Sequence, residues 1–289
     1  MRIQDHRIAT KINKKMDIVA FPDGHFGSEA FLKDEYGRLV DYISSRPNAA
    51  TLFLGDLIDD DRPSTRLLRR SMYNDRSDAF AQEDVKHLLW LDEKVIPKMK
   101  KFLDPAKCLG MLEGDHYRRY SNGLTSTQYL CSKLKIPYLG DGQAVLRLHF
   151  GLDRGKKSRL IQIHCQHGIG GTGRPGNAVN KLEDTAKSWQ GMDMFVRAHS
   201  HRAFIYPISQ YSVSPRGREI IQKDIWLANT SSLRTGFIIN KTDYAERKNY
   251  GATAHKYPVF HLMTKRLRVQ RHKIAIEDRL VIDIAGELI

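Results

Sequence analysis

The stretch MDIVAFPDGH (residues 16–25) shows how the first half of the chain is built. Its apolar run stops abruptly at Pro, Asp and Gly, which predicts a buried strand and then a loop that carries Asp23 and His25. Apolar residues next recur at helical spacing over residues 31–45, and Ser28 is the expected cap of that helix. The predicted order is therefore strand, loop and helix, after a short basic leader.

The same order repeats farther along the chain. ATLFLGD (residues 50–56) predicts a second strand, a basic amphipathic helix is expected within residues 80–103, and CLGMLEGD (residues 108–115) predicts a third strand. Strands that alternate with helices indicate an α/β layer with the functional site at the strand ends. Short strand-like runs follow, namely QAVLRLHF, RLIQIHCQ, MDMFVRAH, RAFIYPI, EIIQKDIWLA, YPVFHLM and RLRVQRHKIAI. We expect a strand-rich, layered α/β protein with its helices outside.

Length, composition and cysteine content favour one soluble domain. The chain has 289 residues, of which 41% are hydrophobic and 28% charged, as is ordinary for a globular protein. We expect a single domain over residues 1–289, with a motif core at 16–202 and a strand-rich C-terminal part at 203–289. Cys108, Cys131 and Cys165 form no C-x-x-C pair, which argues against disulfides and a thiolate zinc site. With no targeting or membrane-length apolar segment visible, we expect a cytoplasmic protein without a membrane partner.

The chain is strongly basic. Lys and Arg number 47 against 33 Asp and Glu, which gives a net charge of +14 with neutral histidines. The excess lies in several clusters: Arg62, Arg66, Arg69 and Arg70; Lys98, Lys100 and Lys101; Lys156, Lys157 and Arg159; and residues 265–273. Such a surface fits a polyanionic partner such as nucleic acid, and it equally fits a solvated basic face.

Acids and imidazoles follow five of the strand-like runs. They are Asp23-x-His25, Gly55-Asp56-x-x-Asp59, Gly114-Asp115-His116, His164-x-x-His167-Gly168 and His199-x-His201. Any one of these motifs is more often a turn or a satisfied core residue. Five of them at successive strand ends are hard to explain by packing, because buried acids and imidazoles are costly unless they are paired or bind a metal.

In this order the motifs resemble those of the calcineurin-like metallophosphoesterases, whose pattern is D-x-H, G-D-x-x-D, G-N-H-D/E, a later H and G-H-x-H. The resemblance runs from Asp23 to His201, about two-thirds of the chain. It implies a layered β-sandwich of mixed sheets flanked by helices, with a binuclear metal centre at one end. It also implies a hydrolase that acts on a phosphate ester.

The resemblance further implies ligands for two divalent metal ions. One ion would be held by Asp23, His25, Asp56 and His201, and the other by Asp56, Asp115, His167 and His199, so that Asp56 bridges them. Mixed carboxylate and imidazole ligands suit Mn, which we expect first, and also Fe, Zn or Ni. Two such ions activate a water molecule as nucleophile and stabilise phosphoryl oxygens, so no protein nucleophile is required.

His116 directly follows a ligand and has no metal to bind in this scheme. We assign it to the substrate, as donor of a hydrogen bond or proton to the phosphoryl or leaving-group oxygen. Asp59 would orient it, because a carboxylate fixes the tautomer and charge of a catalytic imidazole. The alternative is that Asp59 caps a helix.

Three positions depart from the family pattern, since Asp115 replaces Asn, Tyr117 replaces an acid and Ala198 replaces Gly. The change at Asp115 matters most, because an added negative charge holds cations more tightly and opposes an approaching phosphate. Arg118 and Arg119 either offset this charge by contacting phosphate or are ordinary surface arginines.

The glycine-rich run GTGRPG (residues 171–176) matches the dinucleotide-binding pattern G-x-G-x-x-G, but a lone match is a weak signal. We interpret the run as an edge of the phosphoesterase site, with Arg174 and Asn177 as candidate substrate contacts. His164 and His167 have an odd spacing, which puts them on opposite faces of a strand, and His167 is preferred because it precedes a glycine as in the family. The histidines at 6, 87, 149, 255, 261 and 272 are assigned ordinary surface or core roles.

Two classes of function stay open. The first is an active phosphoesterase, for which the net charge favours a phosphodiesterase or nuclease over a phosphomonoesterase that acts on proteins or small metabolites. The second is a non-enzymatic nucleic-acid-binding protein with a degenerate site, which the three departures favour. The filled ligand positions favour the first class.

Overall fold

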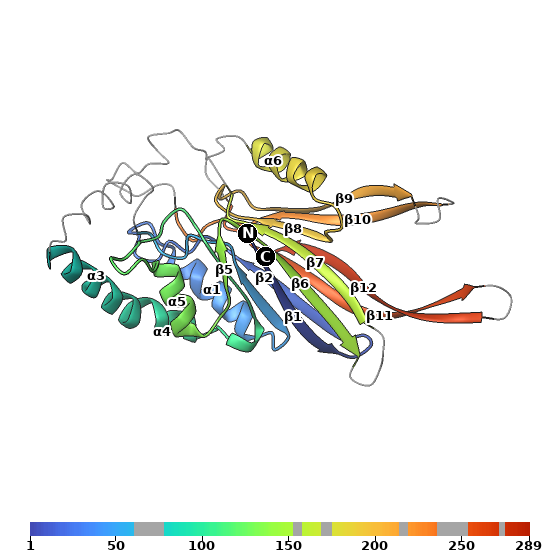
Figure 1. The fold of residues 1–289 in the computed structure, drawn as a ribbon, viewed down its shortest axis with the longest axis horizontal. Helices are drawn as coiled ribbons and strands as arrows, with labels where there is room; N and C mark the ends of the chain where they lie inside the picture. Colours follow the sequence, from blue (N-terminus) through green and yellow to red (C-terminus); the bar gives the residue numbers. More distant parts are fainter. Residues whose placement is uncertain (61–77, 153–157, 169–174, 214–218, 236–253, 272–274) are drawn as a thin grey trace.

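Two six-stranded mixed sheets form the centre of the protein in the computed structural model, which describes residues 1–60, 78–152, 158–168, 175–213, 219–235, 254–271 and 275–289. The sheets pack face to face, and helices cover both outer faces (Figure 1). This is the layered α/β sandwich that the sequence predicts.

Each sheet combines parallel and antiparallel neighbours. In spatial order the first sheet contains β1 (Arg2–Thr10), β6 (Gln143–Leu152), β7 (Ser158–Gln166), β8 (Met194–Arg197), β10 (Ile220–Asn229) and β9 (Phe204–Val213). The second sheet contains β12 (Ala275–Leu288), β11 (Pro258–Arg271), β2 (Lys15–Phe21), β3 (Ala49–Phe53), β4 (Cys108–Glu113) and β5 (Tyr138–Asp141). The strands β2 to β5 are mutually parallel, as are β7, β8 and β10.

The helices are divided unequally between the two outer faces. Those described are α1 (Lys33–Ser44), α3 (Asp78–Trp90), the π-helical turn η1 (Leu91–Val95), α4 (Ile96–Lys100), the 3-10 turn η2 (Pro105–Lys107), α5 (Ser126–Leu134) and α6 (Pro175–Ser188). Residues of α1, η1, α4 and α5 share one apolar cluster with the second sheet, and α6 packs on the first sheet. None of these helices has the length and apolar character needed to cross a membrane.

Strand β2 shows why an unbroken apolar run marks a central strand. Ile18 and Ala20 face the cluster between the two sheets, whereas Val19 and Phe21 face the helices. Successive side chains of a strand point to opposite faces, so a strand covered on both sides needs apolar residues at every position. Burial of each large side chain contributes about 1.5–3 kcal/mol.

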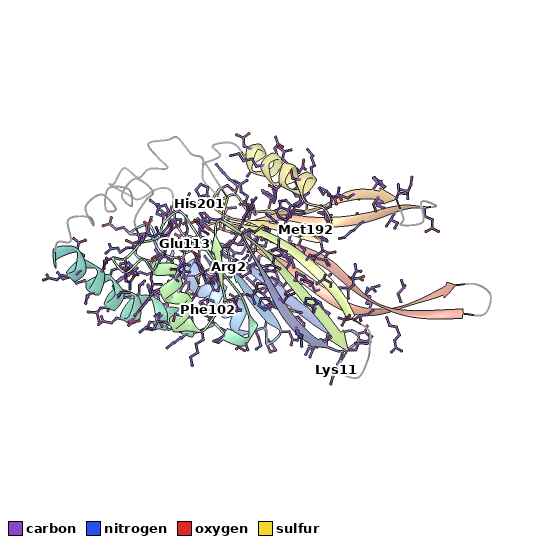
Figure 2. The ribbon with its side chains drawn as sticks, in the orientation of Figure 1. Arg2, Lys11, Phe102, Glu113, Met192 and His201 are labelled. Atoms are coloured by element: carbon purple, nitrogen blue, oxygen red, sulfur yellow. The ribbon has the colours of Figure 1, made fainter. Side chains whose placement is uncertain are left out.

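The carboxyl ends of the parallel strands meet at one end of the sandwich. Figure 2 shows His201 and Glu113 toward this end and Lys11 at the opposite end of the strands. Loops that follow neighbouring parallel strands lie close together, and such strand ends commonly form the binding sites of α/β proteins. The motif residues found in the sequence lie in these loops, except His164, which lies within β7.

Several expectations about local structure were wrong. The basic leader is not a tail, because it forms β1, which pairs in parallel with β6 over Arg2–Thr10. Helix α1 begins at Lys33 with Leu32 as its N-cap residue and no side-chain cap, so Ser28 does not cap it. The Ser28 hydroxyl instead accepts a hydrogen bond from the Ala30 N–H in the preceding turn. Strand β5 and helix α5 were not predicted.

The C-terminal strands are longer than the sequence runs suggest. Two antiparallel pairs, β9 with β10 and β11 with β12, extend in the same direction beyond the rest of the sandwich, and their far ends lie apart (Figure 1). The run RLRVQRHKIAI was expected to be one strand, but β11 ends at Arg271 and β12 begins at Ala275 within it. The antiparallel pairing of β11 with β12 accounts for this division.

Candidate metal centre

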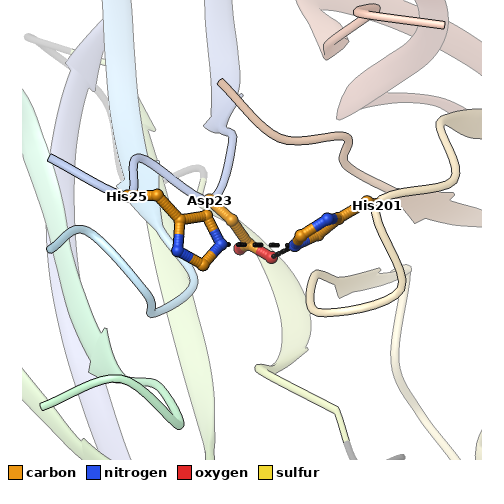
Figure 3. Close-up of side chains that lie close together, drawn as sticks. All are labelled: Asp23, His25 and His201. Atoms are coloured by element: carbon orange, nitrogen blue, oxygen red, sulfur yellow. Dashed lines mark hydrogen bonds and ion pairs between the residues drawn. The ribbon is translucent and has the colours of Figure 1, made fainter. Parts of the chain in front are cut away.

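Asp23, His25 and His201 form one group of candidate ligands, although they come from two different sheets. The loop after β2 carries the first two, and the segment after β8 carries His201 (Figure 3). His201 Nε2 lies 3.2 Å from Asp23 Oδ2 and 3.3 Å from His25 Nε2. One ligand atom of each residue lies within 4.8 Å of the other two, which is close enough for all three to hold one ion.

Asp56, His167 and His199 form a second group of the same kind. His167 Nε2 lies 3.2 Å from Asp56 Oδ2 and 3.2 Å from His199 Nδ1. Asp115 Oδ2 is 3.4 Å from His199 Nδ1, so this carboxylate borders the group. The second group thus draws on the loops after β3, β4, β7 and β8.

Backbone hydrogen bonds join the two groups. The N–H of His199 donates to Asp23 Oδ2 over 3.0 Å, although His199 belongs to the other group. The N–H of His116 donates to Asp56 Oδ1 over 2.8 Å. Each carboxylate is therefore held by a neighbouring loop as well as by an imidazole. The bridging role expected for Asp56 stays a prediction, because its close contacts are to the second group.

The loops reach this arrangement through an unusual backbone. His25, Asp56, His199 and His201 have φ values of 46°, 43°, 68° and 54°. This left-handed region costs a residue with a side chain about 1–2 kcal/mol, and such strain is concentrated at functional sites. Four strained residues in one cluster indicate that their side-chain directions are under functional constraint.

Two glycines make the close packing of these loops feasible. A Cβ atom at Gly55, where φ is +111°, would lie 2.5 Å from His167 Nδ1. A Cβ atom at Gly114 would collide with the backbone nitrogen and a carboxylate oxygen of Asp56. The glycine that precedes each of the two motif acids is therefore a steric requirement of the site.

The charges of the site are buried and only partly satisfied. Asp23, His25, Asp56 and His167 are at most 4% exposed. Among the described residues, Asp23 Oδ1 has no hydrogen-bond partner. A buried carboxylate oxygen without a partner is costly, and a cation would remove that cost. Carboxylate and imidazole donors suit Mn, Fe, Zn or Ni, so the residues fit the predicted metals.

The ionisation states follow from burial and from pairing. Burial opposes the charged form of Asp56, but the neighbouring His167 outweighs it and holds the pKa of Asp56 well below its usual range. Burial also lowers the pKa of His167, yet the charge of Asp56 reverses this and raises it to about 9. Burial lowers the pKa of His25 and of His199, which favours the neutral imidazole that binds metals.

His116 and Asp59 form a separate pair beside the two groups. His116 Nδ1 lies 2.9 Å from Asp59 Oδ1, and His25 Nδ1 lies 3.5 Å from the same oxygen. Burial raises the pKa of Asp59, but its hydrogen bonds with the two histidines outweigh burial and lower it. Asp59 is thus a charged partner shared by two imidazoles. The helix-cap alternative depends on residues 61–77, which lie outside the described residues.

A second ion-pair network lies next to this pair, and the sequence did not reveal it. His87, on α3, has Nε2 2.9 Å from Asp60 Oδ2 and Nδ1 2.8 Å from the Tyr120 hydroxyl. The Arg118 guanidinium lies 3.3 Å from Asp60 Oδ1. His87 was assigned an ordinary role because no motif surrounds it, and only the packing of α3 brings it to Asp60.

The candidate substrate contacts are placed unevenly. Arg118 pairs with Asp60 and is mostly buried, whereas Arg119 is exposed. Asn177 is exposed near the start of α6. Arg174 lies outside the described residues, as do Arg62, Arg66, Arg69 and Arg70.

His164 is separated from the site as the strand spacing predicts. It is fully buried, and its ring centroid lies 5.0 Å from that of Trp189 and 5.6 Å from that of Phe195. Neither ring nitrogen has a hydrogen-bond partner among the described residues. Burial lowers the pKa of His164 to about 4, so it is neutral at neutral pH.

The segment at the end of β10 and just after it holds the Asp23 loop through backbone hydrogen bonds, and the sequence analysis missed it. Asn229, the last residue of β10, and Thr230, Ser231 and Ser232 after it are fully buried. The N–H of Asp23 donates to the Ser231 carbonyl over 3.2 Å, and the Asp23 carbonyl accepts from the Leu233 N–H over 2.9 Å. The only signal was a run of small polar residues directly after an apolar strand.

Comparisons with known proteins give little beyond this geometry. No protein-family model matches the chain, and no curated protein matches its sequence. Among solved structures, the crystal structure of Chaetomium thermophilum Vps29 is similar over 94% of this chain and 96% of that chain. The sequence identity is 10% and the TM-score is 0.33, which is too low to assign a family or an activity.

Proposed function

We propose that this chain is a metal-dependent phosphoesterase of the calcineurin-like type, with two divalent ions bound by the two ligand groups. The observation that carries the proposal is the convergence of both Asp/His groups at one end of the sandwich, with a buried oxygen of Asp23 left unsatisfied among the described residues. When bound, such ions activate water as a nucleophile and stabilise phosphoryl oxygens. Mn is the first choice, with Fe, Zn and Ni as alternatives.

The protein's own contribution is to hold ligands and to move a proton. Asp23, His25 and His201 would hold one ion, and Asp56, His167, His199 and Asp115 the other, with Asp56 bridging. The left-handed backbone and the two glycines keep these side chains directed at one point. Little reorganisation is then needed when a substrate binds.

His116 would act on the substrate. Asp59 lies 2.9 Å from its Nδ1 and stabilises the positively charged imidazole, so Nε2 is the nitrogen that donates to the phosphoryl or leaving-group oxygen. The N–H of His116 also donates to Asp56 Oδ1, which couples the position of this histidine to a metal ligand. Proton donation would therefore occur beside the metal centre.

We further propose that the substrate is a phosphodiester, and specifically nucleic acid. The support is the net charge of +14, which attracts a polyanion to the whole molecule. A phosphomonoesterase acting on proteins or metabolites is the competing interpretation.

We also propose that residues 1–289 form one domain. The cluster between the sheets contains Ile18 and Leu52 from the motif core together with Ala228, Phe260 and Leu262 from the C-terminal part. A core shared in this way favours folding as one unit.

The deciding experiment compares hydrolysis of bis-para-nitrophenyl phosphate and para-nitrophenyl phosphate with Mn, Fe, Zn and Ni. The proposal predicts metal-dependent turnover, faster on the diester, that chelation abolishes. Faster turnover of the monoester would favour the phosphomonoesterase. Metal-free protein that binds none of the four ions would end the proposal.

Asp115 supports a second candidate, a non-enzymatic nucleic-acid-binding protein. Its charge lies 3.4 Å from His199, where the family has a neutral Asn, and it would repel an incoming phosphate. This candidate predicts bound metal and bound nucleic acid without hydrolysis. Asp115→Asn should then create or raise turnover.

A further inference from the structure

Four lysines gather around the loop that leads from the metal centre into α1. We call Lys33, Lys94, Lys98 and Lys101 the lysine patch. Lys94 in η1, Lys98 in α4 and Lys101 at the C-cap of α4 follow one another at helical spacing, so they lie along one side of this continuous helical segment. Lys33 is the first residue of α1.

Contacts with two phenylalanines fix this arrangement. Lys98 Nζ lies 5.4 Å from the ring centroids of both Phe26 and Phe31. Phe26 directly follows the candidate ligand His25 in the chain. The Tyr36 hydroxyl donates to the Lys98 carbonyl over 2.8 Å, which ties α4 to α1. The lysine patch is therefore joined to the site by a short and well-packed loop.

The positive charges of the patch are not compensated. Among the described residues, none of the four lysines forms an ion pair with a carboxylate, and Asp34 and Glu93, the exposed acids nearest in sequence, are not paired with them either. Burial lowers the pKa of Lys98, and the charges of the other three lysines lower it further. Like charges at this spacing destabilise a helix, so an anionic ligand would relieve a real cost.

The lysine patch is positively charged and the elements that carry it expose no large apolar side chain, and this combination indicates the kind of ligand that it can bind. Within the described residues, no large hydrophobic side chain of α1, η1 or α4 is exposed; Val85 and Leu89 are exposed on α3, which precedes η1. The elements that carry the four lysines therefore lack the apolar face of a membrane-binding helix. From Lys94 to Lys101 the helix rises about 10 Å, and one strand of a duplex carries a phosphate about every 3.4 Å of axis. The length over which Lys94, Lys98 and Lys101 are spread therefore matches a short stretch of phosphate backbone.

We infer that the lysine patch binds the phosphate backbone of a nucleic-acid strand. The choice of nucleic acid as ligand rests on the proposed phosphodiesterase function, whereas the patch itself rests on its own geometry. Contacts with the backbone carry no base information, so this binding is independent of sequence.

The test compares two triple variants with the same change of charge. The first replaces Lys94, Lys98 and Lys101 by Gln. The control replaces Lys15, Lys107 and Lys187 by Gln, three exposed lysines that each pair with an aspartate outside η1, α4 and α1. Binding of labelled DNA and RNA strands and duplexes is measured by fluorescence anisotropy at about 50 and 200 mM salt. Melting temperature and metal content are measured on the same preparations to show that both variants fold.

The patch variant should bind at least roughly tenfold more weakly at low salt, and the slope of log affinity against log salt should become shallower by about 2. The control should match the wild type. An unchanged slope in the patch variant, equal weakening in the control, or no binding by the wild type overturns the inference. Hydrolysis of bis-para-nitrophenyl phosphate by the wild type tests the proposed enzyme activity separately from nucleic-acid binding. Weakened binding without any hydrolysis supports the lysine patch and contradicts the proposed enzyme.

Discussion

Two Asp/His arrangements lie at the same end of the sandwich and differ in how their polar atoms are satisfied. In the group around Asp23, the carboxylate is fully buried and one of its oxygens has no partner among the described residues. In the pair of His116 and Asp59, the two side chains meet at 2.9 Å and remain 17% and 20% exposed. The first arrangement calls for a cation, whereas in the second the imidazole and the carboxylate form an ion pair that reaches solvent.

This difference separates two uses of the same residue types. A metal ligand needs an open donor atom directed at the ion, and an acid catalyst needs a partner on one nitrogen and access to substrate on the other. The two roles overlap at one place, because His25, Asp59 and His116 are also close enough together to hold an ion. Variants that separate metal content from turnover decide which role His116 has.

Asp56→Ala should have the largest effect. The change removes the carboxylate that lies 3.2 Å from His167 Nε2 and accepts from the His116 N–H. We expect the protein to lose bound metal and, with it, all detectable hydrolysis, because metal activation of water is lost. Elemental analysis of gently purified protein measures the first effect. Asp141→Ala, at an exposed carboxylate on β5, is the control and should change neither property. Full metal content in Asp56→Ala would rule out the proposed ligand set.

His116→Ala should reduce turnover by roughly 10²- to 10⁴-fold, as expected for a lost general acid, and leave metal content at the wild-type level. The reason is that His116 contacts Asp59 and belongs to neither of the two proposed ligand groups. Parallel measurements of metal content and kcat make the comparison with Asp56→Ala direct. If both variants lose metal equally, His116 belongs to a third ligand group.

Asp59→Asn should have an intermediate effect. The amide keeps a hydrogen-bonding group near His116 but removes the charge that stabilises its protonated form, so we expect a loss of roughly 10- to 100-fold in turnover. Because His25 Nδ1 lies 3.5 Å from the same oxygen, metal affinity should fall less than turnover. Metal titrations followed by kcat at saturating metal separate these effects. If only the metal affinity changed, Asp59 would position the ligand His25 and would have no role in orienting His116.

The fold was predictable wherever burial left an apolar pattern. The second half of β2, residues 18–21, is covered on both faces and forms an unbroken apolar run that the sequence displays. Strand β1 lies at a sheet edge with mostly exposed or half-buried side chains, and its position depends on backbone pairing with β6. Backbone pairing leaves no side-chain pattern, and for that reason β1 was mistaken for a leader.

The candidate site divides in the same way. Its Asp and His residues could be found because each lies at the end of a recognisable strand, in the order of a known pattern. The supporting segment at Ser231 and Ser232 contributes backbone groups, which any residue type can supply. The contact between His87 and Asp60 arises from the packing of α3, and no local sequence feature encodes it.

His87→Ala should have a modest effect that extends the comparison to the second network. It removes hydrogen-bond partners from Asp60 and Tyr120 in a largely buried environment, which should cost about 1–3 kcal/mol of stability. Turnover should fall a few-fold through displacement of the adjacent Asp59, with metal content retained. Thermal unfolding and kcat measure the two effects, and His87→Gln should restore part of both. Unchanged stability would mean that this network does not position the loop.

His164→Leu should have the smallest effect, because His164 lies within β7 and only His167, in the loop directly after this strand, belongs to a ligand group. His164 is fully buried without a hydrogen-bond partner among the described residues, so an apolar side chain of similar size removes an unsatisfied group. Its pKa is lowered by burial from 6.5 to about 4, so the unfolded chain binds a proton more readily than the folded protein in that range. The wild type should therefore lose stability relative to the variant as pH falls from 6.5 toward 4, and the two should respond alike to pH above 7. Urea unfolding at several pH values measures this difference, with metal content and turnover expected to stay unchanged. Loss of metal in His164→Leu, comparable to that in His167→Leu, would instead show that the wrong histidine was chosen as the ligand.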